Sequence, residues 1–168
     1  MLRFLMFLGL SLGVLVGPAV ADEVPRPEGE VLLTVSGEIA NTNAEGAAQF
    51  DMDMLMAMPA TRFRTTTLWT EGVKTFKGVS LIELLEVVGV NGKTLRATAL
   101  NDYSIEIPVD SIQAGAPIVA YEMDGETMSR RQKGPLWIVY PYDSDEDFRT
   151  EVIYSRSIWQ LDRIEIVK

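Results

Sequence analysis

The sequence predicts a single α+β domain that is rich in β-strand. Short apolar and β-branched runs recur along the chain, and turn residues bound most of them. The helical patterns are short and interrupt these runs at irregular spacing, which favours a mixed α+β arrangement over a sheet built by regular strand–helix alternation. The sequence shows no internal repeat, no low-complexity tract and no second linker, so one domain is expected.

The N-terminal residues predict an export signal. Arg3 precedes an apolar run from Phe4 to Val16, Gly17 breaks that run, and Ala19-Val20-Ala21 offers the small residues that a signal peptidase requires. The run is shorter than the about 20 apolar residues of a spanning helix. We therefore expect residues 1–21 to be a signal peptide that is cleaved after Ala21, export to the periplasm, and no membrane insertion after cleavage. An uncleaved membrane anchor is the alternative.

The next segments predict a tether and the first elements of the domain. Prolines in residues 22–29 favour an extended tether, and the domain is expected over residues 30–168. Asp51 is a helix-capping residue type, and Ser80 with Glu83 matches a capping box. The expected elements are a strand at Glu30–Ser36, a helix at Phe50–Met58, a strand at Phe63–Trp69, a turn at Thr75–Gly78 and a helix at Ser80–Val88 that Gly89 ends.

Four methionines lie in the first of these helices, at Met52, Met54, Met56 and Met58. Thioethers favour Cu(I), so a copper-binding array is one interpretation. Methionine also fills irregular gaps in protein cores, and this is the interpretation we favour.

The second half of the chain predicts mostly strands. Asn101-Asp102 breaks one apolar run in two, and Asp124-Gly125 is a hairpin signal. The expected elements are strands at Leu95–Leu100 and Tyr103–Ile107, a helical turn at Pro108–Gln113, a hairpin of Ile118–Glu122 with Thr127–Ser129, and closing strands at Leu136–Tyr140 and Leu161–Val167.

The composition excludes several classes of function. Asp and Glu outnumber Lys and Arg by 24 to 15, and a net charge of −9 argues against nucleic acid as a partner. Part of this charge lies in Asp143–Asp147, which we interpret as a solvated loop because its spacing matches no calcium-binding loop. The sequence contains no Cys and no His. It therefore lacks a thiolate nucleophile, the commonest general base and the commonest zinc ligands, and no metal is expected.

Four segments carry polar and aromatic groups that are suited to a ligand. One predicted strand holds Arg62, Arg64, Thr65 and Trp69, and a strand break holds Asn101, Asp102 and Tyr103. The others are the basic run Arg130–Lys133 and the segment Ile153–Trp159. Arg offers a planar donor fork to an anionic or electron-rich ligand, and Trp can stack on a flat ring. A solvated turn and core tryptophans are the alternatives.

In order along the chain, several segments resemble the sulfite-oxidase fold, the molybdopterin-binding oxidoreductase domain. Phe76–Leu85 is similar to the family's W-x-G-x-x-L-x-x-L-L pattern, with Phe76 for the usual Trp. Lys133–Pro141 resembles its G-P-x-R-x-x-x-P stretch, and Ser157–Trp159 with Asp162–Ile166 resembles its closing segment. The resemblance covers nearly all of the chain after the predicted signal peptide. It implies one domain with a β-rich sulfite-oxidase-like fold.

The resemblance also implies a function, with one departure. Arg62–Trp69 resembles the strand that carries the molybdenum-ligating cysteine in catalytic members, and Thr65 takes the place of that cysteine. A threonine hydroxyl is a poor substitute for a thiolate on molybdenum. The resemblance implies a pterin pocket formed by the following residues: Arg64, Thr65, Trp69, Asn101, Asp102, Tyr103, Arg131 and Trp159.

Three functions are therefore open. The leading expectation is a non-catalytic, periplasmic pterin-binding protein that reports ligand occupancy to the periplasmic domain of a membrane sensor. The first alternative is a molybdopterin-dependent oxidoreductase or accessory subunit, with molybdopterin as the cofactor. The second is a ligand-free scaffold that acts through its surface.

Overall fold

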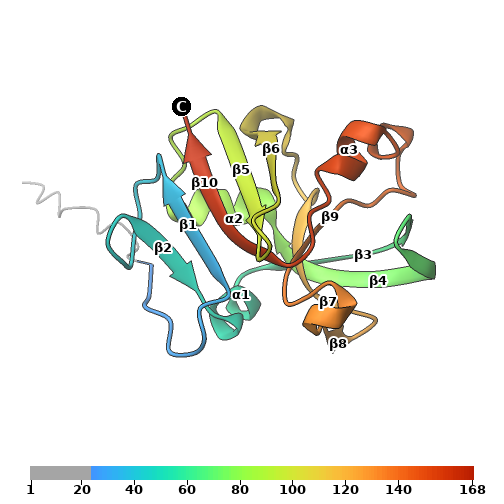
Figure 1. The fold of residues 1–168 in the computed structure, drawn as a ribbon, viewed down its shortest axis with the longest axis horizontal. Helices are drawn as coiled ribbons and strands as arrows, with labels where there is room; N and C mark the ends of the chain where they lie inside the picture. The colour runs from blue at the N-terminus through green and yellow to red at the C-terminus, as the bar shows by residue number, and fades with distance from the viewer. Residues whose placement is uncertain (1–23) are drawn as a thin grey trace, which may run out of the picture.

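The computed structural model describes residues 24–168, so the predicted signal peptide lies outside the described residues. Within them, ten strands form two five-stranded sheets that lie beside each other (Figure 1). The first sheet has the order β2-β1-β10-β5-β6 and consists of β1 (Leu33–Gly37), β2 (Ala47–Phe50), β5 (Thr94–Ala99), β6 (Ser104–Pro108) and β10 (Leu161–Val167).

The second sheet has the order β3-β4-β7-β8, and β9 also pairs with β7. Its strands are β3 (Ala60–Thr67), β4 (Thr70–Ser80), β7 (Ile118–Met123), β8 (Glu126–Thr127) and β9 (Trp137–Val139). The helices are α1 (Met52–Ala57), α2 (Leu81–Val88) and α3 (Glu151–Ser155), with 3₁₀ turns η1 (Val109–Ser111), η2 (Arg130–Gln132) and η3 (Glu146–Phe148).

The chain directions confirm a mixed α+β fold. Strand β1 runs parallel to β10, whereas the other strand pairs are antiparallel. One buried apolar cluster joins residues of both sheets and of α2. Leu84 and Val88 of α2, Leu95 of β5 and Trp137 of β9 are all fully shielded from solvent in this cluster. The single domain expected from the sequence therefore has one continuous core.

Local signals predicted both ends of α1 and the end of α2. Asp51 caps α1, since its carboxylate accepts a hydrogen bond from the Met54 N–H. Gly89 ends α2 in the left-handed region at φ 64°, where glycine is favoured. The capping box predicted at Ser80 is wrong, because the Ser80 hydroxyl accepts a hydrogen bond from the Gly115 N–H and does not cap α2.

The turn predicted over Thr75–Gly78 is also wrong, because these residues lie within the long strand β4. Pairing with β3 on one side and β7 on the other holds β4 extended despite its glycines. A Cβ at Gly78 would lie 2.1 Å from the carbonyl oxygen of Val119, so glycine permits the close approach of β7. Strand β2 and helix α3 were not predicted, since both are short and carry weak local patterns.

The segment expected to be a tether packs onto the domain. Val24 is buried, and the backbone N–H groups of Glu28 and Gly29 each donate to Oδ2 of Asp51 at 2.8 Å. The domain therefore begins at Val24 among the described residues. Three of the four methionines, Met52, Met54 and Met58, pack against the core, as the core interpretation predicts. No helix within residues 24–168 is long and apolar enough to cross a membrane.

Candidate functional site

A pocket of about 390 Å³ opens where the second sheet meets helix α3 and the turn between β5 and β6. Figure 1 shows α3 on the same side of the molecule as the far end of the β3–β4 hairpin. We call this the aromatic pocket. Its lining residues are Trp69, Ala99, Asn101, Tyr103, Tyr154, Ser155, Ser157, Ile158 and Trp159.

Trp69 is the centre of the aromatic wall. It lies in the turn between β3 and β4, and its ring centroid is 5.6 Å from that of Trp159 and 6.1 Å from that of Tyr154. The rings of Trp137 and Tyr142 lie behind it at 5.9 and 6.3 Å. All four contacts are edge-to-face, an arrangement that fixes the orientation of the Trp69 ring.

A buried hydrogen-bond chain supports the floor of the aromatic pocket. The Tyr142 hydroxyl donates to Ser157 Oγ at 2.5 Å, and Ser157 Oγ donates to the Ile153 carbonyl at 3.0 Å. The indole N–H of Trp137 donates to the Ser157 carbonyl at 3.4 Å. Burial raises the pKa of Tyr142 well above its usual value, so its phenol stays neutral and remains a donor.

The groups that face the open part of the aromatic pocket are uncharged. Asn101 Oδ1 accepts a hydrogen bond from the Tyr103 N–H at 3.2 Å, which leaves the amide NH₂ of Asn101 free to donate. The hydroxyls of Ser155 and Ser157 already donate to the Val152 and Ile153 carbonyls, and no residue of the lining carries a charge. The pocket can therefore hold a flat, neutral, polar ring against an aromatic face and bond to its edge through Asn101.

The positively charged side chain of Lys133 lies behind the wall of the aromatic pocket. The Lys133 Nζ atom lies 4.3 Å from the ring centroid of Trp159 and 5.7 Å from that of Trp137. Lys133 adopts a left-handed conformation at φ 75°, and its carbonyl accepts the Gln160 N–H at 3.0 Å. These contacts fix Lys133 next to Trp159, where its charge is attracted to the indole face.

The structure brings together half of the eight site residues that the sequence predicted. Trp69, Asn101, Tyr103 and Trp159 line the aromatic pocket, and they come from three separate segments of the chain. The other four, Arg64, Thr65, Asp102 and Arg131, are not part of its lining.

Two of those four lie on β3 and are directed away from the pocket. Arg64 is exposed and Thr65 is buried, as expected for neighbours on opposite faces of a strand. The Thr65 hydroxyl accepts the Asp143 N–H at 3.0 Å and donates to the Thr66 carbonyl at 3.1 Å. Thr65 therefore acts as a buried structural contact.

The other two lie on exposed turns. Asp102 adopts a left-handed conformation at φ 65° in the turn between β5 and β6, which turns its carboxylate out to pair with Arg163. Arg131 belongs to η2 and is exposed. Neither side chain reaches the ring-binding space, because the turn directs each of them toward solvent.

Tyr154, Ser155 and Ser157 also line the aromatic pocket. They lie in the segment Ile153–Trp159, which the sequence indicated as suited to a ligand, but only Trp159 was predicted from it as a site residue. Their positions depend on α3, which begins after the cap Thr150 and contains only five residues. The Thr-Glu pair at its start is the one local signal that could have indicated this helix.

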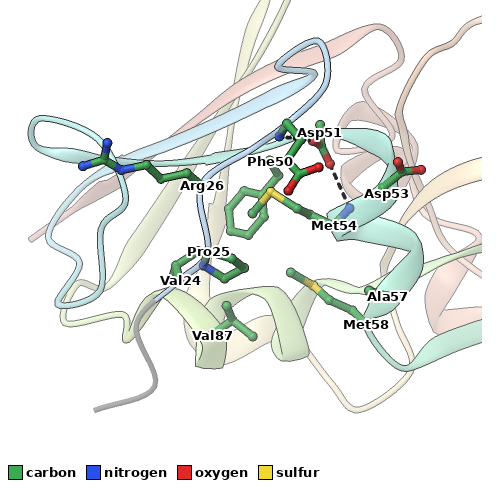
Figure 2. Close-up of a pocket in the computed structure, with 11 residues that line it drawn as sticks. Val24, Pro25, Arg26, Phe50, Asp51, Asp53, Met54, Ala57, Met58 and Val87 are labelled. Atoms are coloured by element: carbon green, nitrogen blue, oxygen red, sulfur yellow. Dashed lines mark hydrogen bonds between the residues drawn. The ribbon is translucent and has the colours of Figure 1, made fainter. Parts of the chain in front are cut away.

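A second pocket, of about 450 Å³, lies beside the N-terminal segment. We call it the methionine pocket. Figure 2 shows Val24, Pro25 and Val87 facing Met54 and Met58 across it. The carboxylate of Asp51 in its wall already accepts three backbone hydrogen bonds, which lower the pKa of this group. The methionine pocket is therefore mainly apolar, with the charged residues Arg26, Glu28 and Asp53 also in its lining, and Phe50 is the one aromatic ring that it offers to a flat ligand.

The residues at the aromatic pocket suit the ring of a pterin but not the metal of a molybdenum cofactor. The chain has no Cys, and Thr65 is directed toward Asp143. Within residues 24–168, no three His, Cys, Asp or Glu side chains are grouped so that they could hold a metal ion. A soft thiolate ligand for molybdenum is thus missing from the donor set, and no step is assigned to that metal.

Comparisons with known proteins identify the family and the fold of the chain. The family model described as "Oxidoreductase molybdopterin binding domain" matches residues 23–143. The fold is similar to that of the sulfane dehydrogenase SoxCD from Paracoccus pantotrophus, with a TM-score of 0.60 and 20% identity. That match covers 80% of this chain and 37% of the other. No curated protein matches the sequence. The sulfite-oxidase-like fold predicted from the sequence is confirmed.

Proposed function

Because the chain belongs to the family of the oxidoreductase molybdopterin-binding domain, we propose that it is a periplasmic, non-catalytic pterin-binding protein. The observation that carries this proposal is the aromatic pocket, whose lining combines the rings of two tryptophans and two tyrosines with an amide and carries no charge. Its volume of about 390 Å³ lies within the roughly 300–1,000 Å³ that is usual for small-molecule sites.

The chemistry of a pterin matches this lining. A pterin is a flat ring with an amide–amidine edge, so one of its faces can stack on Trp69 or Trp159 while Asn101 bonds to its edge. An uncharged lining gives no compensation for a phosphate inside the pocket, because a buried anion needs a charged or donor-rich partner. The ligand we propose is therefore a pterin without phosphate, held but not chemically changed.

The first experiment identifies what the protein carries. The full-length gene is expressed, and the protein is purified from the periplasmic fraction and denatured. The released small molecules are oxidised and assayed for pterin fluorescence, and molybdenum is measured by elemental mass spectrometry. We expect pterin without molybdenum. Stoichiometric molybdenum would contradict the proposal, and finding neither pterin nor molybdenum would favour a ligand-free scaffold.

A second candidate function is a molybdopterin-dependent oxidoreductase or accessory subunit. One observation favours it: Arg130, Arg131 and Lys133 lie in one turn of the chain, Lys133 lies beside Trp159, and none of the ion pairs found within residues 24–168 includes the three residues. Such cations suit a phosphate that extends from the bound ring past Trp159. Titrations with 6-hydroxymethylpterin and with its phosphate ester separate the two candidates, because only the second predicts tighter binding of the ester.

We further propose that ligand occupancy is reported to the periplasmic domain of a membrane sensor. The mouth of the aromatic pocket supports this, since Leu68, Tyr103 and Val152 expose large apolar side chains on the three segments around it. If a neighbouring gene encodes such a sensor, its periplasmic domain should bind the pterin-loaded protein more tightly than the empty one. Equal affinity of the two forms for that domain would contradict the reporting role.

A further inference from the structure

A short set of hydrogen bonds joins the two walls of the aromatic pocket. One wall is the β3–β4 hairpin, which carries Trp69 in its turn, and the other is the segment 141–157, which includes α3. The Thr66 N–H donates to Asp143 Oδ2 at 2.6 Å, and the Thr66 hydroxyl donates to Asp143 Oδ1 at 2.7 Å. The Asp143 N–H donates in return to Thr65 Oγ1 at 3.0 Å.

These bonds are the only described hydrogen bonds between the two walls. Between residues 60–80 and 141–157 no other is found in the described part of the chain. The remaining contacts across the gap are the edge-to-face contacts of Trp69 with Tyr142 and Tyr154. Strand β3 is an edge strand of its sheet, so β4 is its only strand neighbour. The position of the hairpin turn therefore depends on the segment 141–157 together with the contacts of Trp69 with Trp137 and Trp159.

The chain position of Asp143 links these bonds to the ligand-binding groups. Asp143 directly follows Tyr142, which contacts Trp69 and bonds to Ser157 in the pocket floor. A shift of Asp143 away from β3 would move Tyr142 and loosen the contact between Trp69 and Tyr154. Because stacking depends on the spacing of the rings, a small displacement here changes how well a flat ligand fits.

We propose that Thr65, Thr66 and Asp143 form a clamp that sets the width of the aromatic pocket, so that Thr65 is a positioning residue for ligand binding. This inference deepens the proposed function and rests on it for its effect on affinity. It assigns a positioning role to Thr65, the residue that the family resemblance aligns with the cysteine of catalytic members. The hydroxyl of Thr65 and the carboxylate of Asp143 are used to hold the two walls together.

Removal of the clamp should change pocket width and affinity together. In Asp143→Ala both acceptors for Thr66 are lost, and we expect the Kd for 6-hydroxymethylpterin to rise about tenfold, since a hydrogen bond to a charged group contributes on the order of one such factor. Asp143→Asn keeps an acceptor and a polar group of the same shape and should restore most of the affinity. Thr65→Val should weaken binding, whereas Thr65→Ser should not.

A ligand-independent measurement follows the walls themselves. Because the chain has no Cys, spin labels can be placed through Leu68→Cys and Val152→Cys, two exposed positions on opposite walls. Double electron–electron resonance should show a narrow distribution of the distance between the two labels in the otherwise unchanged protein. Adding Asp143→Ala should broaden this distribution or shift it to longer distance.

Asp124 provides the matched control. It is also an exposed aspartate whose carboxylate accepts a backbone N–H, that of Thr75 at 2.9 Å, and a side-chain donor, Lys74 Nζ at 3.0 Å. It bonds to β4 away from the aromatic pocket, so Asp124→Ala should lower the melting temperature without changing the label distance or the Kd.

The two proposals can fail separately. If the labelled Asp143→Ala protein keeps the narrow distance distribution, the clamp is refuted whether or not pterin binds. If the distribution broadens while the unlabelled protein with its native sequence binds no pterin, the clamp stands and the proposed function fails.

Discussion

The methionine pocket and the aromatic pocket have similar volumes and different chemistry. The first is lined mainly by aliphatic and thioether side chains with one aromatic ring, and its lining also includes charged residues, whereas its one buried carboxylate is fully used by backbone N–H groups. The second has several aromatic rings, an amide at its open side and no charged residue. The first pocket is the larger of the two. Volume alone would therefore favour the methionine pocket, whereas aromatic faces beside a neutral donor favour the aromatic pocket for a flat, neutral ring.

The two pockets also differ in what their residues are expected to do. At the methionine pocket, Asp51 fastens the N-terminal segment to α1. At the aromatic pocket, Trp69 and Tyr142 hold a wall against which a ring can stack. Changes at the first site should therefore alter stability without altering ligand binding, whereas changes to the aromatic side chains that line the second should alter ligand binding.

The largest expected effect separates the two pockets by affinity. Trp159→Ala removes a partly exposed wall of the aromatic pocket, and loss of one stacking partner should raise the Kd for 6-hydroxymethylpterin about 10- to 100-fold. The matched control is Met58→Ala, which shortens a wall of the methionine pocket. Fluorescence titration should give it the Kd of the unchanged protein. Similar losses in the two variants would contradict the assignment of the ligand to the aromatic pocket.

The next effect separates the pockets by stability. Asp51→Ala leaves the N–H groups of Glu28, Gly29 and Met54 without their acceptor, so the N-terminal segment and α1 should both loosen. We expect the melting temperature to fall by about 5 °C and the Kd for pterin to stay unchanged. Calorimetry and titration of the same sample measure both quantities. A rise in Kd without a fall in melting temperature would reverse the roles that we assign to the pockets.

A smaller effect concerns the floor of the aromatic pocket. Tyr142→Phe removes the buried hydroxyl that donates to Ser157 at 2.5 Å, and the free energy of unfolding in urea should fall by about 1 kcal/mol. Tyr103→Phe is the control, because the Tyr103 side chain is 55% exposed and its hydroxyl can bond to water in either state. If Tyr142→Phe proves as stable as Tyr103→Phe, the hydrogen-bond chain does not support the pocket.

The parts of the fold that the sequence predicted depend on neighbours in sequence. Asp51 caps α1 over three residues, Gly89 ends α2, and Asp124-Gly125 turns β7 into β8. Strand β4 was missed because its extended form comes from pairing with β3 and β7 and not from its own residues, two of which are Gly72 and Gly78.

The candidate site divides in the same way. Trp69 and Trp159 could be selected by residue type and by family resemblance, and both line the aromatic pocket. Thr65 was predicted to be in the site from its place in a polar strand and from that resemblance, whereas its actual partner is Asp143, 78 residues away along the chain. No local pattern reports such a pairing, because both residues are also common in ordinary strands and turns. Only the packed structure shows that Asp143 belongs to the clamp and not merely to a solvated acidic loop.

The smallest expected effect is a response to acid, and it again contrasts the two pockets. Hydrogen bonds from Gly29 and Met54 lower the pKa of Asp51, and those from Thr66 lower the pKa of Asp143, to which the charge of Arg149 adds. A carboxyl whose pKa is lower in the folded state stabilises that state above its ordinary pKa and stops doing so as the pH falls through the folded value.

Stability should therefore be level above about pH 5 and decline below about pH 4, as urea unfolding at a series of pH values can measure. Pterin affinity should weaken over the same range, because protonated Asp143 has one acceptor fewer for Thr66. The weakening should persist in Asp51→Ala and be reduced in Asp143→Ala, whose clamp is already open. Protonation of the ligand itself affects the Kd of all three proteins equally, so a comparison among the three proteins removes this contribution. If the Kd depends on acid equally in the three proteins, the clamp does not set the affinity. If the acid dependence of the Kd disappears only in Asp51→Ala, the methionine pocket and not the clamp controls the affinity.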